Sequence, residues 1–197
     1  MKIFFIRHGE STSDVEDRYG GAYDDHLTEK GREQARRLAQ DINGRGIEKF
    51  YTSPLLRARE TAEILALCMK CELEIADDLR EQNYFAQLSG MTREEALLHF
   101  PHMVAMLPHA DTPLPGAESR KDFIERVTRA FSRITSDFHA ILGVVTHAGP
   151  IRRVVHEILG LGEIVHIDHG AIITLEDDHQ QWKVLDLINV TFEHHHR

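Results

Sequence analysis

A nearly uninterrupted apolar run at residues 140–146 restricts the possible folds of this chain more than any other segment does. The run lacks the alternation of apolar and polar residues that marks a half-exposed strand. It is typical of a strand in the middle of a sheet that is covered on both faces. We therefore expect an α/β architecture built around this segment.

Strand-like and helix-like segments alternate along the rest of the chain. Short apolar runs predict strands at residues 2–6, 49–52 and 73–76, and the runs at 171–175 and 182–187 predict a closing hairpin. The alternation indicates a three-layer α/β/α sandwich with a mostly parallel central sheet. The order of the strands does not follow from the sequence.

Capping residues and apolar spacing predict the first two helices. Thr28 should cap a helix that stops at Gly44. Ser53 as N-cap and Pro54 at the first helical position should open a second helix, which ends near Met69.

Three further helices are expected in the second half of the chain. A short helix near residues 94–100 should lie among irregular chain around its prolines, and a last helix should begin at Pro150 and end at Gly160. Between them, residues 119–138 predict a long helix that buries one apolar stripe. The stripe consists of Phe123, Val127, Phe131, Ile134 and Phe138.

Length and charge restrict the classes of partner. The chain has 197 residues, 42% of them hydrophobic, and a formal net charge of −9, which favours one globular domain over residues 1–193. The negative charge argues against nucleic acid and anionic membranes as partners. The start of the chain has no secretory signal pattern and no stretch has the length of a membrane span, so we expect a cytoplasmic location. Residues 194–197 are interpreted as a tag remnant.

Residues suited to phosphate binding follow three of the predicted strands. Arg7 and His8 follow the first strand, Arg57 comes shortly after the second, and His147 and Ala148 follow the run at 140–146. In open α/β sheets, ligands bind beyond the carboxyl ends of the strands. Arginine forks bind phosphate oxygens, and the free N–H groups of the helix after Gly149 would favour an anion as well.

This set of side chains suits transfer of a phosphoryl group through a histidine. A neutral His8 imidazole could attack phosphorus and form a phosphohistidine that water later hydrolyses. His147 would donate to a phosphoryl oxygen, and Glu81 is the candidate general acid for the leaving group. Any one of these residues alone would usually be an ordinary hydrogen-bonded or ion-paired surface residue, so the argument depends on their coincidence at one edge of the sheet.

Metal and redox sites are the competing interpretations. His99 and His102, and likewise His166 and His169, have the spacing of helical metal ligands, but no cysteine or carboxylate set completes either pair. Pro101 also interrupts the first pair. The only cysteines, Cys68 and Cys71, lack a second pair and are interpreted as structural.

Five ordered motifs resemble the histidine phosphatase superfamily, which is also called the phosphoglycerate mutase-like family. The motifs lie within residues 2–160. They are IRHGES (6–11), RYGGAYDDHLTEKGREQA (18–35), YTSPLLRARETAEIL (51–65), PGAES (115–119) and VVTHAGPIRRVV (144–155).

The resemblance implies a role for each matching residue. It implies a phosphohistidine at His8, a phosphate pocket of Arg7, Arg57 and His147, and Glu81 as proton donor. It also implies that a further set of residues borders the substrate, and that no metal or organic cofactor takes part. This set is Asp14, Gly20, Gly21, Tyr84 and the N–H of Ala148.

Two of the departures from the family pattern bear on the expected substrate site, whereas His26 at a frequent proline position and Ala148 at a frequent glycine position do not affect the mechanism. Asp14 stands where asparagine is common, and a carboxylate there would repel phosphate unless it is paired or protonated. After Glu81, the sequence YFAQLSG (84–90) replaces the usual run in the segment where the leaving group should lie.

The segment at about 81–115 is expected to form a lid that determines specificity. It is short, and its positive charge is limited to Arg93 with His99, His102 and His109, so it should hold a bisphosphate poorly and admit water. We therefore expect a small-molecule phosphatase similar to the alpha-ribazole phosphatase branch. A cofactor-dependent phosphoglycerate mutase and a non-catalytic phospholigand-binding module are the alternatives, and a homodimer is an open expectation.

Overall fold

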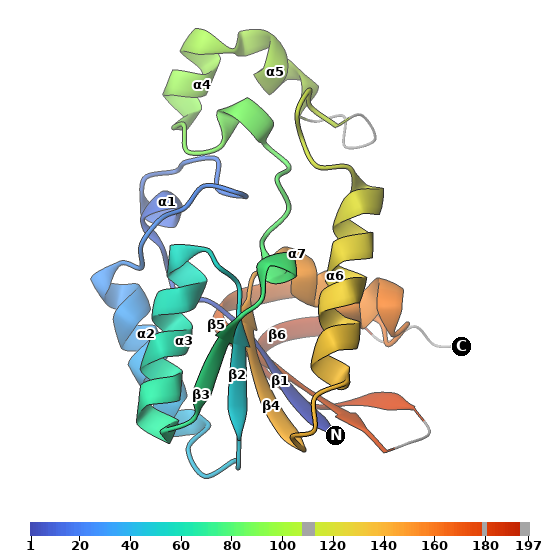
Figure 1. Ribbon diagram of the computed structural model, residues 1–197. Coiled ribbons are helices and arrows are strands. Elements are labelled where there is room, and N and C mark those ends of the chain that lie inside the picture. Colours follow the sequence, from blue (N-terminus) through green and yellow to red (C-terminus); the bar gives the residue numbers. More distant parts are fainter. Residues whose placement is uncertain (108–112, 179–180, 194–197) are drawn as a thin grey trace.

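The computed structural model describes residues 1–107, 113–178 and 181–193. Its centre is a six-stranded sheet with the strand order β3-β2-β4-β1-β5-β6 (Figure 1). Strands β1 to β4 pair in parallel, whereas β5 pairs antiparallel with both β1 and β6. This confirms the predicted α/β class with a mostly parallel sheet. The strands are β1 (Lys2–Arg7), β2 (Lys49–Thr52), β3 (Glu72–Ile75), β4 (Ile141–Thr146), β5 (Glu163–Asp177) and β6 (Trp182–Glu193).

The apolar run that suggested the fold is β4, which lies between β2 and β1. Leu142, Val144 and Val145 have no exposed surface. Val144 belongs to the core on one face of the sheet and Val145 to the core on the other. A strand with helices on both faces buries successive side chains in two cores, which explains why the run does not alternate.

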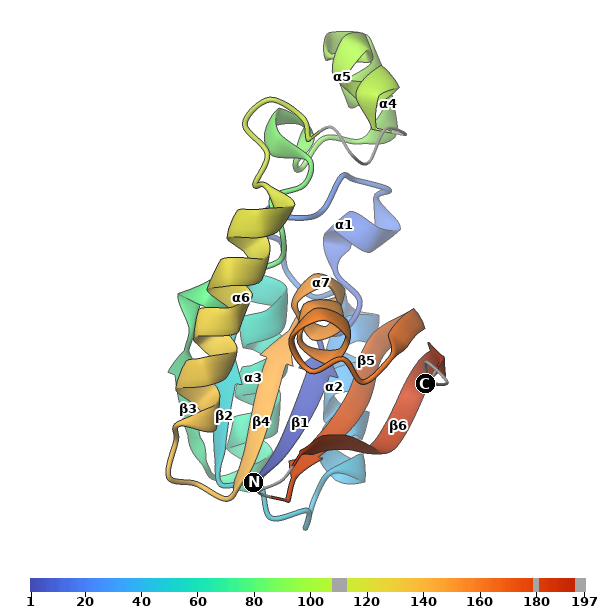
Figure 2. The ribbon, with the colours of Figure 1, turned by 90° about the vertical axis from the view of Figure 1, so that its right-hand side faces the viewer.

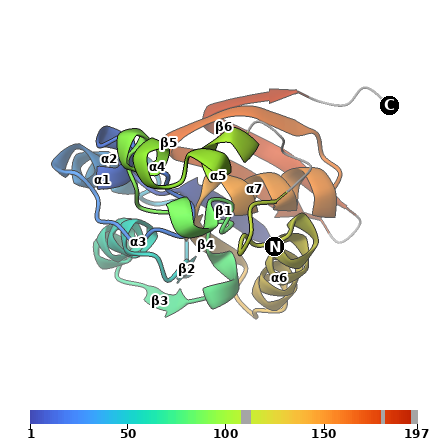
Figure 3. The ribbon, with the colours of Figure 1, turned by 90° about the horizontal axis from the view of Figure 1, so that it is seen from above.

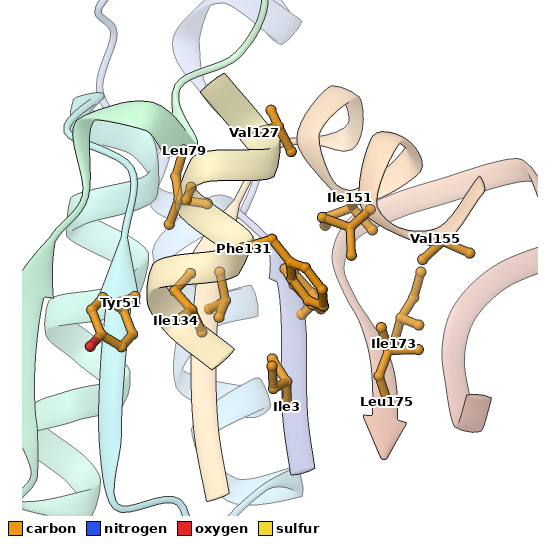
Figure 4. Close-up of a cluster of buried hydrophobic side chains, with 14 of the residues drawn as sticks. Ile3, Tyr51, Leu79, Val127, Phe131, Ile134, Ile151, Val155, Ile173 and Leu175 are labelled. Carbon is orange, nitrogen blue, oxygen red and sulfur yellow. The ribbon is translucent and has the colours of Figure 1, made fainter. Parts of the chain in front are cut away.

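Helices cover both faces of the sheet. Helices α2 (Glu29–Asp41) and α3 (Leu56–Met69) lie on one face, and α6 (Arg120–Thr135) and α7 (Ala148–Arg152) lie on the other (Figures 2 and 3). Alternate residues of β1 enter the two cores: Phe4 and Ile6 pack on the side of α2 and α3, while Ile3 packs with Phe131 and Ile151 on the side of α6 and α7 (Figure 4).

Two predicted helix starts are confirmed, but one predicted end is wrong. The Thr28 hydroxyl accepts the Gly31 N–H at 3.0 Å, and the Ser119 hydroxyl accepts the Asp122 N–H at 3.1 Å, as N-caps do. However, α6 ends at Thr135, so Phe138 lies beyond the helix. Its side chain no longer falls on the apolar stripe and is 90% exposed.

Two other predicted helix starts need correction. Helix α3 begins at Leu56 with Leu55 as its N-cap, so neither Ser53 nor Pro54 occupies the predicted position. Helix α7 begins at Ala148 rather than Pro150; a proline inside the first turn breaks no helical hydrogen bond. The helix widens into a π-helical turn at Arg153–Ile158 and ends before Gly160, as expected.

A small upper layer stands above the carboxyl ends of the strands (Figure 1). It contains α1 (Thr12–Val15), α4 (Arg93–His99) and α5 (Pro101–Met106). The prediction of irregular chain around Pro101 is wrong, because this proline opens α5. The layer has its own core of Tyr19, Leu88, Ala96, Met103 and Leu114, so residues 81–115 pack against the loop that carries Tyr19, and their role as a lid stays a prediction.

Some predictions fall outside the described residues. His109 of the lid segment and the histidines at 194–196 are among them. Among the helices that the structure describes, none is long and apolar enough to cross a membrane.

Candidate active site

The carboxyl ends of three adjacent strands bring the predicted residues together. In the sheet, Arg7 of β1 lies opposite Thr146 of β4, so the next residues, His8 and His147, emerge side by side. Their ring centroids are 4.9 Å apart and the rings meet edge to face. The structure therefore places the two predicted histidines on the same edge of the sheet.

His8 is held in one tautomer by two contacts. Its Nδ1 lies 2.7 Å from the carbonyl oxygen of Gly9, which can only accept, so Nδ1 carries the hydrogen. The Arg57 Nε–H donates to His8 Nε2 at 3.2 Å, which requires a lone pair on Nε2. Burial, then the charges of Arg57 and Arg7, lower the pKa of His8 well below the ordinary 6.5. His8 is therefore a neutral imidazole whose lone pair lies on Nε2.

His147 is oriented by Ser53, a contact that the sequence did not reveal. The Ser53 Oγ accepts the Leu55 N–H at 3.3 Å and lies 2.8 Å from His147 Nε2. The serine hydrogen can then point to Nε2, which leaves the hydrogen of His147 on Nδ1. Burial and, as the second cause, the positive charge of Arg57 lower the pKa of His147 well below the ordinary 6.5. Within the described part of the chain, the buried Nδ1 has no hydrogen-bond partner.

Arg57 is buried and anchored to the loop that precedes it in the chain. Its Nη1 donates to the carbonyl of Tyr23 at 2.6 Å and to Asp25 Oδ1 at 2.7 Å, and its Nη2 donates to the carbonyl of Gly21 at 2.9 Å. These bonds fix the direction of the Nε–H that meets His8. Asp25 was missed because its role depends on a partner more than thirty residues away in the chain.

Arg7 faces a residue that we considered only as a metal ligand. Its Nη1 donates to the carbonyl of Ile167 at 2.6 Å, and its Nη2 lies 3.0 Å from Nε2 of His169. The same His169 nitrogen is 3.1 Å from Asp14 Oδ2. The Asp14 carboxylate therefore lies within hydrogen-bond distance of His169, whose imidazole can offset its charge only when it is protonated.

Glu81 lies at the N-terminus of α7. Its Oε2 accepts the Gly149 N–H at 3.0 Å, so this N–H is committed to Glu81. A Cβ at Gly149 would lie 2.0 Å from Glu81 Oε1. Only glycine allows the carboxyl to approach the helix this closely.

A buried arginine supports the Glu81 backbone. Arg126 makes a forked ion pair with Glu118, with distances of 2.6 and 2.8 Å. It also donates to the carbonyls of Asp78, Arg80 and Glu81 at 2.7 to 3.0 Å. One guanidinium therefore fixes three carbonyls around the candidate acid.

The remaining predicted residues lie around this centre. Gly21 has a positive φ of 62°, and a Cβ there would come within 3.1 Å of the Gln82 carbonyl, so the two loops touch. Tyr84 follows in that second loop and packs edge-on against Phe85. Gly20 lies near Ser13, and Ala148 is the first residue of α7.

The alternative metal pairs do not form compact ligand sets. His99 and His102 belong to different helices, because α4 ends before Phe100 and α5 begins after it. His166 pairs with Asp168, whereas His169 points to Arg7. Within the described ranges, no group of three or more histidine, cysteine or carboxylate residues could hold a metal ion.

Comparison with known proteins defines the class to which this fold and site belong. Residues 3–190 match the histidine phosphatase superfamily (branch 1). The chain therefore belongs to that superfamily, and the resemblance seen in the five motifs is confirmed.

Individual relatives agree with this assignment. The chain is 35% identical to phosphoglycerate mutase-like protein 4 of Arabidopsis thaliana, over 77% of this chain and 68% of the relative. It is 26% identical to putative phosphoserine phosphatase 2 of Hydrogenobacter thermophilus, over 87% of each. A crystal structure of a putative alpha-ribazole-5'-P phosphatase from Escherichia coli covers 95% of each chain with a TM-score of 0.82 at 22% identity, which shows a shared fold. Members of this class include phosphatases and mutases.

Proposed function

We propose that this protein is a phosphatase that hydrolyses a small-molecule phosphomonoester through a phosphohistidine on His8. The observation that carries the proposal is the state of His8: Nδ1 is bonded to the Gly9 carbonyl, and Nε2 presents a lone pair beside the Arg57 guanidinium. A neutral imidazole that is held in one direction is a competent nucleophile.

The first step forms the phosphohistidine. Arg7 and Arg57 bind the phosphoryl oxygens, and the Nδ1–H of His147 donates to one of them. His8 Nε2 attacks phosphorus, the new N–P bond forms, and the P–O bond to the leaving group breaks with its electron pair on that oxygen. Glu81, in its protonated form, gives its proton to this oxygen, a contribution of about 10²- to 10⁴-fold for general acids.

The second step returns the enzyme to its initial state. Glu81, now a carboxylate, accepts a proton from a water molecule as the water oxygen attacks phosphorus. The N–P bond breaks, and the electron pair returns to His8 Nε2. Inorganic phosphate leaves, and Glu81 again carries the proton that the next cycle needs.

The charges near the lid favour a phosphatase over a mutase. Arg93 lies over the Tyr19 ring and pairs with Asp17 at 3.3 Å. No other arginine or lysine occurs in the described part of residues 81–115, so this segment offers no uncommitted cation to a second phosphate. A bisphosphate would be held poorly, and water should reach the phosphohistidine.

The substrate class is a small phosphomonoester, and alpha-ribazole phosphate is one candidate. The similar proteins carry names that point to different substrates, so the choice among them needs a screen. Such a screen should include alpha-ribazole phosphate, phosphoserine and 3-phosphoglycerate. Conversion of 3-phosphoglycerate to its 2-isomer would instead favour the mutase. The homodimer and the cytoplasmic location stay predictions.

The proposed intermediate can be tested directly by rapid quench with a ³²P-labelled substrate. We expect acid-labile, alkali-stable label on the peptide that contains His8 within the first turnover. His8→Ala should carry no label and release no phosphate, whereas His102→Ala, a change at an exposed residue, should behave as wild type. Turnover by wild type without label at any time would overturn the phosphohistidine mechanism. Tight binding without turnover of any substrate would favour the binding module.

A further inference from the structure

His169 Nε2 has two neighbours, one of which requires a hydrogen-bond acceptor at this nitrogen and the other a hydrogen-bond donor. Arg7 Nη2, which can only donate, lies 3.0 Å away, and Asp14 Oδ2, which can only accept when ionised, lies 3.1 Å away. One ring nitrogen either holds a lone pair or carries a hydrogen. It can therefore satisfy Arg7 or Asp14, but not both.

The fold holds these three side chains together through an irregular part of β5. The pairing of β5 with β6 shifts register between Ile167 and Ile172, and Gly170 has a positive φ of 70°. The Gly170 N–H donates to the carbonyl of His8 at 3.2 Å, and the Ile167 carbonyl receives Arg7. The bulge thereby directs His169 towards the end of β1, with its ring centroid 5.9 Å from that of His8.

Asp14 is kept ionised in this position. Partial burial opposes its charge, but the nearby His169 imidazole and the hydrogen bonds from Ser11 outweigh burial and hold the pKa of Asp14 below its usual range. The Ser11 N–H and hydroxyl both donate to Oδ2 at 2.8 Å. A carboxylate so close to Arg7 would repel a phosphate dianion unless a positive charge offsets it.

The charged and titratable groups that face His169 come from three elements. Arg7 and His8 belong to the end of β1, and Asp14 belongs to α1. Glu10, in the loop between them, also interacts with His169, but its carboxylate is already bonded to Lys30 and Thr28. Asp14 is therefore the carboxylate whose charge His169 is best placed to offset.

We propose that His169 is a positioning residue that takes up one proton from solvent when a phosphoryl group binds Arg7. The Arg7 Nη2–H turns to a phosphoryl oxygen, His169 gains a hydrogen on Nε2, and this N–H donates to Asp14. Protonation thus frees Arg7 for the ligand and neutralises the carboxylate in the same step. The inference rests on the proposed function only in taking a tetrahedral phosphoryl group as the ligand of Arg7.

Binding of tungstate tests this proposal without turnover. Tungstate is a tetrahedral dianion whose charge is constant from about pH 6 to pH 8.5, so any proton uptake over that range belongs to the protein. Calorimetry in two buffers of different ionisation enthalpy measures the uptake. We expect close to one proton per tungstate at the alkaline end, and a dissociation constant that rises by up to about tenfold per pH unit there.

Variants separate the proposed role from a structural one. His169→Leu should weaken tungstate binding by about tenfold or more, because the Asp14 carboxylate is left without its cation. His169→Gln preserves a polar side chain and should lose the proton uptake. The double variant Asp14→Asn/His169→Leu should bind tungstate more tightly than His169→Leu alone and independently of pH. A residue with a merely structural role would not be rescued by a change at Asp14.

The control is His166→Gln on the same strand, an exposed residue that contacts Asp168. It should behave as wild type. Tungstate binding by wild type without proton uptake, or failure of Asp14→Asn to rescue His169→Leu, would overturn the role of His169 and leave the proposed function untouched. Coupled binding in a protein that never forms labelled His8 would overturn the catalytic proposal instead.

Discussion

His8 and His147 meet edge to face with ring centroids 4.9 Å apart, although they are 139 positions apart in the chain. The contact follows from the parallel pairing of Arg7 with Thr146 in adjacent strands. Because both rings are buried next to Arg57 and Arg7, both remain neutral at pH values at which exposed histidines begin to take up protons. The neutral state of the two buried rings also affects how the free energy of unfolding depends on pH.

The two buried histidines should make the protein less stable as the pH falls below 6.5. In the unfolded chain they take up protons near their ordinary pKa, whereas their lowered pKa values keep them neutral in the folded protein. Unfolding therefore binds protons, and the free energy of unfolding should fall by about 1 kcal/mol per histidine between about pH 7.5 and 5.5. Urea denaturation at the two pH values measures this fall.

Replacement of the two rings provides the comparison for this measurement. The double variant His8→Asn/His147→Asn should lose much of the pH dependence, while His102→Asn at an exposed site should retain it. An unchanged pH dependence in the double variant would show that other groups are responsible.

Glu81→Gln should lower the turnover of substrates with poor leaving groups far more than that of substrates with good ones. An alkoxide needs a proton as it departs, whereas p-nitrophenolate does not, so kcat for an alkyl phosphate should fall by about 10²- to 10⁴-fold and kcat for p-nitrophenyl phosphate by much less. Steady-state kinetics on both substrates gives the ratio. Equal losses would remove Glu81 from the role of general acid.

Gly149→Ala should reproduce the kinetic effect of Glu81→Gln without replacing an ionisable group. The new methyl group would lie 2.0 Å from Glu81 Oε1, and the carboxyl would have to leave the Gly149 N–H. A misplacement of about 1 Å can cost about a hundredfold in rate, and the loss should again fall on alkyl phosphates. The same pair of substrates, with a circular dichroism spectrum to check folding, measures it. Wild-type kinetics for Gly149→Ala would show that the position of Glu81 is unimportant.

Arg126→Met should destabilise the protein strongly, whereas Arg129→Met on the same helix should not. The Arg126 side chain is 6% exposed and bonds Glu118 with three carbonyls, so its loss should cost about 3 kcal/mol. Arg129 is 63% exposed and pairs only with Asp78, a type of contact worth about 0–1 kcal/mol. Denaturant unfolding of the two variants compares them. Similar losses would indicate that the Arg126 bonds contribute no more than a surface ion pair.

Much of the fold could be predicted because local patterns determine it. The run at 140–146 required a strand with cover on both faces, and the caps Thr28 and Ser119 marked helix starts through bonds to residues three positions ahead. Phe138 shows the limit of such patterns. Its spacing fits the apolar stripe, but the helix ends before it. The spacing of apolar residues does not fix the last residue of a helix, because helix ends fray.

His8 and His147 lie together, because they follow strands whose carboxyl ends share one edge, and Arg57 reaches His8 from the helix after β2. Ser53, Asp25 and His169 were missed or given other roles. Ser53 seemed an N-cap, since nothing in its neighbourhood reveals His147 as its partner. His169 seemed half of a metal site, since its spacing to His166 was visible and its contacts with Arg7 and Asp14 were not.

The sequence by itself therefore determined the layers and the strands whose ends carry the candidate site residues. Only the tertiary structure decided which nitrogen of His8 carries the hydrogen, which side chains meet the Asp14 carboxylate, and how closely Glu81 approaches α7. The reason is physical: helix and strand formation depend on residues a few positions apart, whereas hydrogen-bond direction and desolvation depend on partners that the folded sheet brings from distant parts of the chain.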